Sequence, residues 1–135
     1  MQAEDISPIR LQGGWPRRGS VGVTHNTGIA IVSMRGEHDV GTAPAVTDAL
    51  VRAVAHSSVL VDLSECDFID STVIGLLIRC AHELERRGER FALVLPHDQP
   101  VVARIAALTR LTEVLAIHGS REAGLAHLRR PAQPG

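Results

Sequence analysis

The stretch VLVDLSECDFIDSTVIGLL, residues 59–77, decides the fold of this chain. The stretch opens with most of the run SVLVDL, residues 58–63, whose nearly continuous apolar residues are typical of a strand buried on both faces of a parallel sheet. Polar residues follow, and the spacing of the next apolar residues predicts a helix over 71–87. The inward stripe of that helix is Val73, Ile74, Leu77, Ile78, Ala81 and Leu84. A strand that leads into a helix in this way is the basic unit of an α/β domain.

The same alternation continues on both sides of this stretch. Upstream, 21–23 and 29–34 predict a hairpin, 36–39 a connector, and 42–55 a helix with Thr42 as N-cap. Downstream, the pattern predicts a strand at 91–95, a helix from 98–100 to 108, a strand at 114–117 and a helix at 121–128. The order β-β-α-β-α-β-α-β-α predicts a mainly parallel sheet of four to five strands with an N-terminal hairpin and about four helices.

Composition indicates one domain, over 21–128, with a tail at each end. The 135 residues fit a single domain, and 44% hydrophobic with 21% charged residues is typical of globular proteins. Residues 1–20 and 129–135 are rich in Gly, Pro and Arg, so we expect flexible tails there. Trp15 lies in the first tail, where it either packs back on the domain or contacts a partner.

Charge and residue usage exclude several classes of function. The net charge is −1, with 14 basic and 15 acidic residues, so nothing in the balance favours direct nucleic-acid binding. The chain has no lysine, which excludes a Schiff-base enzyme and a Walker-type phosphate loop. No apolar run is long enough to span a membrane, and the N-terminus lacks a signal-peptide core. We therefore expect a cytoplasmic protein that is not inserted in a membrane.

No residue cluster predicts catalysis, a metal or a cofactor. The seven histidines are scattered without the spacing of a metal site. His38 is expected to be a solvated loop residue. Cys66 and Cys80 are expected to be reduced thiols, and the neighbouring Asp67 opposes formation of a thiolate at Cys66. The sequence thus predicts a protein that is not an enzyme.

Asp70, Ser71 and Thr72 stand where the predicted strand leads into the helix. A helix N-terminus has unpaired N–H groups and a partial positive charge, which favour a phosphate group on a hydroxyl at that point. The same three residue types are also the preferred helix caps, so capping alone would explain them. Gly75, inside the helix, costs about 1 kcal/mol relative to alanine. A glycine at this position indicates that another group approaches the helix closely. Packing of the helix on the sheet would explain the missing side chain equally well.

Three segments of this chain together resemble the STAS domain family, in particular its anti-sigma factor antagonists. One is FIDSTVIGLL after VLVDLSECD, and another is MRGEHDVGTAP, residues 34–44, which is similar to the Gly-Glu-x-Asp segment of the family. The third is RIAALTRLTEVLAIHGSREAGLAHL, residues 104–128, which is similar to its C-terminal helix, strand and helix. The resemblance covers 21–128 and implies the STAS fold.

The resemblance also implies a mechanism and a site. In this family the anti-sigma factor is itself a serine kinase and phosphorylates the position matching Ser71. The unphosphorylated antagonist binds that partner and releases a sigma factor for transcription, in a stress response, and a serine phosphatase resets the switch. The implied partner-binding residues are Glu37, Asp39, Asp70, Ser71, Thr72, Val73 and Gly75. Val73 stands where the family commonly has glycine, and its bulk is expected to narrow access to Ser71.

Two other functions stay open at this point. Some STAS-like domains are adaptor subunits of membrane transport ATPases and are not phosphorylated. A small-ligand or nucleotide sensor is the other alternative. The oligomeric state, the sigma factor and the inducing signal are not indicated by the sequence.

Overall fold

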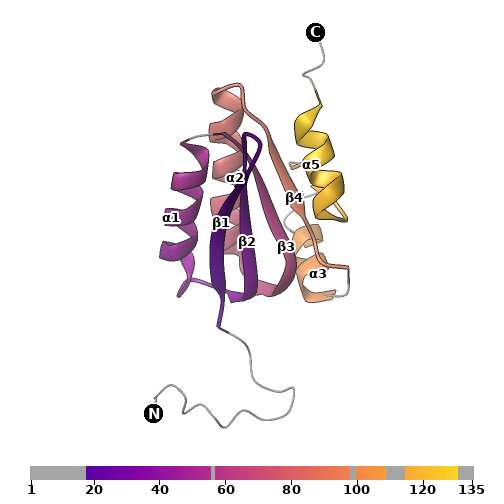
Figure 1. The fold of residues 1–135 in the computed structure, drawn as a ribbon. Coiled ribbons are helices and arrows are strands. Elements are labelled where there is room, and N and C mark those ends of the chain that lie inside the picture. The colour runs from indigo at the N-terminus through magenta and orange to yellow at the C-terminus, as the bar shows by residue number, and fades with distance from the viewer. Residues whose placement is uncertain (1–17, 56, 98–99, 109–114, 131–135) are drawn as a thin grey trace, which may run out of the picture.

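The computed structural model describes residues 18–55, 57–97, 100–108 and 115–130 (Figure 1). Five strands form one sheet: β1 (Ser20–Asn26), β2 (Ile29–His38), β3 (Ser58–Ile69), β4 (Phe91–Val94) and β5 (Ile117–His118). They lie in the order β1-β2-β3-β4-β5, with β1 antiparallel to β2 and the remaining pairs parallel. The four described helices are α1 (Ala43–Val54), α2 (Ser71–Arg86), α3 (Pro100–Leu108) and α5 (Arg121–Arg129). This is the α/β architecture predicted from the sequence.

The sheet separates two apolar layers because successive side chains of a strand point to opposite faces. The larger layer joins α1 and α2 to every second residue of β2 and β3, including Val32, Val61 and Leu63. The smaller layer packs α5 through Leu125 and Leu128 against the other face. Figure 1 shows α1 and α2 on one side of the sheet and α5 on the other.

Two strands are longer than predicted, and both extensions lie next to Ser71. The expected connector 36–39 belongs to β2 up to His38, and the expected polar segment after 63 continues β3 to Ile69. Their backbones pair in parallel register, with Glu37 opposite Phe68 and His38 opposite Ile69. The extension satisfies backbone N–H and C=O groups that a loop would have to expose to water.

The remaining boundaries shift by a few residues. The last strand is Ile117–His118 rather than 114–117, although the carbonyl of Ala116 still accepts from the Leu93 amide. Val114 lies outside the described residues. The first strand, expected at 21–23, begins at Ser20 and ends at Asn26. Residues 1–17 and 131–135, including Trp15, lie outside the described residues.

Candidate functional site

The carboxyl ends of β2 and β3 meet at one edge of the sheet, and α1 and α2 both begin there (Figure 1). The backbone N–H of Asp70 donates to the carbonyl of His38 at 3.1 Å, which joins the start of α2 to the end of β2. We name this region the Ser71 edge: Glu37, Asp39, Asp70, Ser71 and Thr72. In parallel α/β sheets, ligands and partners are commonly met at the carboxyl ends of strands.

Ser71 is the first residue of α2 and is exposed, as is Thr72. Asp70 has extended backbone, and its Oδ1 accepts from the N–H of Val73 at 3.1 Å. Asp70 is therefore the helix cap, and capping needs neither hydroxyl. Ser71 holds its Oγ at a helix N-terminus, where the aligned amides stabilise a negative charge.

Val73 and Gly75, two of the residues that the resemblance implies for partner binding, have different surroundings. The side chain of Val73 is fully buried, so it stands behind Ser71 in the core and does not narrow access to the hydroxyl from solvent. For the same reason its side chain is not offered to a partner. A Cβ at Gly75 would meet nothing within 4 Å, which excludes close packing on the sheet as the reason for glycine at this position.

His38 is not the solvated loop residue that was expected. It is the last residue of β2, and its side chain is completely buried. Its Nε2 lies 3.2 Å from the carbonyl oxygen of Ser20 and 3.0 Å from that of Arg35, and its Nδ1 lies 3.0 Å from Oγ1 of Thr42. The prediction is wrong because the charged residues Glu37 and Asp39 flank a buried strand residue and do not mark a loop. Buried residues alternate at Met34, Gly36 and His38 in the structure, but glycine and histidine are not apolar, so the sequence itself has no alternation that would place His38 in a strand.

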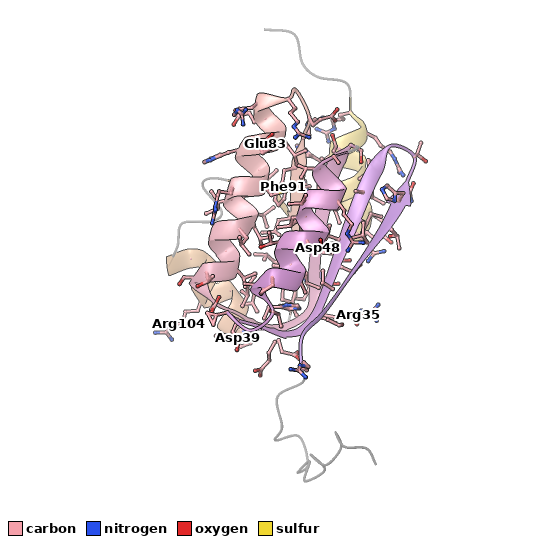
Figure 2. The ribbon with its side chains drawn as sticks, turned by 90° about the vertical axis from the view of Figure 1, so that its left-hand side faces the viewer. Arg35, Asp39, Asp48, Glu83, Phe91 and Arg104 are labelled. Atoms are coloured by element: carbon pink, nitrogen blue, oxygen red, sulfur yellow. The ribbon has the colours of Figure 1, made fainter. Side chains whose placement is uncertain are left out.

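Two acidic side chains of the β2 end have different roles. Glu37 is half-buried, and its backbone pairs with that of Phe68 in β3. Asp39 is exposed, and its Oδ1 accepts from the N–H of Gly41 at 2.8 Å. Figure 2 shows Asp39 at the same end of the molecule as the start of α1. Together with Asp70 these carboxylates make the Ser71 edge negative, so a partner that binds it should present positive charge or N–H donors.

The two cysteines are free and buried, in accordance with the expected reduced thiols. Burial, together with the negative charges of Asp67 and Glu37, raises the pKa of the Cys66 thiol to about 11, although its hydrogen bond to the Phe68 carbonyl acts in the opposite direction. Burial raises the pKa of Cys80 to about 12. Both thiols therefore stay protonated at neutral pH and are poor nucleophiles.

Neither a metal cluster nor a membrane span is found among the residues that the structure describes. No three His, Cys, Asp or Glu side chains gather there in a way that could hold a metal ion. None of the described helices has both the length and the apolar character needed to cross a bilayer.

Comparisons with known proteins find a family model and solved structures that are similar to this chain. The family model described as the STAS domain matches residues 20–123, and no curated protein matches the chain. An anti-sigma factor antagonist from Mycobacterium paratuberculosis is 26% identical, with a TM-score of 0.76 over 84% of this chain and 96% of that one. The unphosphorylated form of the anti-sigma factor antagonist SpoIIAA is 18% identical, with a TM-score of 0.70 over 84% and 100%. The phosphorylated form of the Bacillus cell fate determinant SpoIIAA is 17% identical, with a TM-score of 0.61 over 82% and 100%.

Proposed function

This chain belongs to the STAS domain family, and we propose that it is an anti-sigma factor antagonist regulated by phosphorylation of Ser71. The unphosphorylated form binds an anti-sigma factor in the cytoplasm, which releases a sigma factor. The anti-sigma factor is also the serine kinase, and a serine phosphatase reverses the modification. The antagonist from Mycobacterium paratuberculosis, at 26% identity and nearly full coverage, supports the first part of this proposal.

One observation carries the proposal: Ser71 is exposed at the N-terminus of α2 and is not used as the cap. A kinase needs access to the hydroxyl, and the cap at Asp70 holds the helix in place whether or not Ser71 is modified. The amides of the first turn stabilise the added phosphate, which carries roughly −1.5 to −2 charges. Modification therefore changes the charge of the Ser71 edge without a need to refold it.

The chemistry of the transfer explains why modification would end the complex. Oγ of Ser71 attacks the γ-phosphorus of ATP held by the partner, the bond to the β-phosphate oxygen breaks, and ADP leaves as the serine proton passes to a base. Directly after transfer, the phosphoserine lies against the β-phosphate of ADP and beside the carboxylate of Asp70. Like charges at this distance repel, and the complex is weakened.

The test is phosphorylation and binding with an anti-sigma factor kinase of the same organism. Incubation with ATP should place one phosphate on Ser71, mapped by mass spectrometry. Ser71→Ala should bind whether or not ATP is present, and Ser71→Asp should bind more weakly. A coupling of 3 kcal/mol, the upper end of the usual range, corresponds to roughly 150-fold in affinity.

Thr72→Ala is the matched control, since Thr72 is an exposed hydroxyl one residue away. It should be phosphorylated and released like the wild type. A complex that forms while Ser71 stays unmodified would contradict the switch but not the antagonist role. Capture of a membrane transport ATPase instead of an anti-sigma factor would contradict both and favour an adaptor function.

A further inference from the structure

A stripe of exposed apolar side chains runs along the outer side of α1. Its apolar members are Val40, Pro44 and Val51, and Thr47 lies between the last two. Pro44, Thr47 and Val51 have the three- and four-residue spacing of one helix face, and Val40 lies just before the helix. Val40 is 63% exposed and Val51 is 61% exposed, and no other large hydrophobic residue in the described part of the chain is classed as exposed. We name these four residues the α1 stripe.

The α1 stripe lines a shallow depression and continues into a groove. The depression has a volume of about 610 Å³ and is bordered by Asp48. The groove, of about 430 Å³, lies between α1 and α2 and shares Thr47 and Val51 with the depression. Both hollows have apolar side chains on their α1 side, and charged residues of α2 border the groove. Exposed apolar patches with a polar rim mark interaction sites.

The described chain begins beside the Val40 end of this stripe. The backbone of Arg18 forms an isolated parallel β-bridge with that of Glu37, and the carbonyl of Ser20 accepts from the His38 ring. A Cβ at Gly19 would lie 2.2 Å from the carbonyl oxygen of Glu37 and 2.8 Å from the His38 ring, so only glycine lets the backbone pass this closely. The same ring contacts Thr42, the N-cap of α1. The residues directly before β1 are thereby held next to the start of α1. Figure 1 shows that β1 and α1 begin at the same end of the molecule.

The sequence before these residues has the composition and length to cover the stripe. Residues 1–17 contain the apolar side chains Ile6, Ile9, Leu11 and Trp15. At about 3.4 Å per extended residue, Trp15 reaches about 10 Å from Arg18 and Leu11 about 24 Å. Helix α1 has 12 residues, which span about 18 Å at 1.5 Å per residue. Seven residues therefore suffice to follow the whole helix.

We propose that residues 1–17 of this chain seat on the α1 stripe, with Trp15 over Val40 and Pro44 and with Leu11 near Val51. Apolar side chains of both surfaces are removed from water, which is the driving force. The positive charges of Arg10 and Arg17 complement the carboxylates of Asp39 and Asp48 at the margin of the stripe. The inference does not rest on the proposed function, but the seated segment would border the Ser71 edge.

Trp15 makes the proposal directly testable, because it is the only tryptophan and the chain has no tyrosine. In the full-length chain, its emission should be blue-shifted and its quenching by acrylamide several-fold weaker than in a synthetic peptide of residues 1–20. The double variant Val40→Asn, Val51→Arg should shift the emission and the quenching towards those of the peptide, and each single variant should lie between. Both positions are exposed, so the variants should fold, as far-UV circular dichroism would verify.

The matched control is Ala126→Arg, which adds a charge at an exposed position of α5 and should leave Trp15 shielded. Peptide-like quenching in the wild type would overturn the proposal. So would shielding that survives in the double variant, because the segment would then lie elsewhere. Shielding that rises with protein concentration would also overturn it and would assign the α1 stripe to a second copy of the chain.

Discussion

His38 is the residue on which the geometry of the Ser71 edge depends most. Both oxygens facing Nε2 are backbone carbonyls, so this nitrogen carries a proton and donates. The ring thus links the start of β1, the end of β2 and the cap of α1, while the His38 carbonyl holds the N–H of Asp70. A buried polar group with all these partners specifies one arrangement of the four chain segments.

Replacement of His38 by alanine should therefore lower the free energy of unfolding by about 2–4 kcal/mol, measured by urea denaturation. The cause is a cavity together with carbonyl groups left without their donor. His82→Ala is the control, since His82 is exposed on α2, and it should change stability by no more than about 0.5 kcal/mol. Equal losses in the two variants would mean that the His38 hydrogen bonds contribute nothing specific.

The helices differ in what their glycines do. In α2, a Cβ at Gly75 would meet only open space. In α5, a Cβ at Gly124 would lie 2.6 Å from Cδ1 of Leu60, a side chain that is completely buried in β3. Gly124 therefore lets α5 approach the sheet, whereas no contact within the described chain requires glycine at position 75.

Alanine at these two positions should have opposite effects on the free energy of unfolding. Gly75→Ala should raise it by about 0.5–1 kcal/mol, because alanine favours the helix and displaces nothing. Gly124→Ala should lower it by about 1 kcal/mol, since overpacking against Leu60 exceeds the same gain in helix propensity. Thermal and urea denaturation of both variants would measure the difference, and a stabilised Gly124→Ala would show that Leu60 can move aside.

Gly75→Ala also separates stability from partner binding. If a partner approaches the first turns of α2 closely, the added methyl group should weaken that complex while the isolated protein becomes more stable. An unchanged affinity would confine the partner surface to the Ser71 edge and exclude Gly75 from it.

At the scale of the whole molecule, one ion pair joins segments that are far apart in the sequence. Asp62, the fifth of the twelve residues of β3, accepts from Nε of Arg121 at 2.9 Å, and the same guanidinium donates to Oγ of Ser33 at 3.1 Å. Burial of Asp62 disfavours its charge, but the hydrogen bonds from Ser64 and the charge of Arg121 outweigh this and hold the pKa of the carboxyl below its ordinary value of 3.8. Arg121, the first residue of α5, is thereby joined to both β3 and β2 of the sheet.

This pair should make the free energy of unfolding depend on pH. The folded-state pKa lies below 3.8, so the stabilisation is complete above that value and is lost as the pH falls through the folded-state pKa. At neutral pH, Asp62→Asn should be about 1–2 kcal/mol less stable than the wild type, and the gap should close in acid below the folded-state pKa. Urea denaturation across this range measures it.

Asp48→Asn is the control, because the Asp48–Arg52 pair is largely exposed and such pairs contribute little. A gap between Asp62→Asn and the wild type that persists unchanged in acid would show that the loss comes from packing rather than from charge.

The elements of this protein were predictable because their signals are local. Apolar periodicity, the cap at Asp70 and the continuous apolar run of β3 act within a few residues, and the order of strands and helices follows from them. The position of Ser71 at the start of α2 belongs to this class.

Only the tertiary structure decided how segments that lie far apart in the chain contact one another. Burial of His38 requires β1, β2 and α1 to meet, and no local pattern of charges reveals that meeting. The open space at Gly75 and the tight contact at Gly124 likewise depend on which helix face meets the sheet. Sequence periodicity determines that a helix has an inner face, but the packed neighbours determine how much room each side chain has.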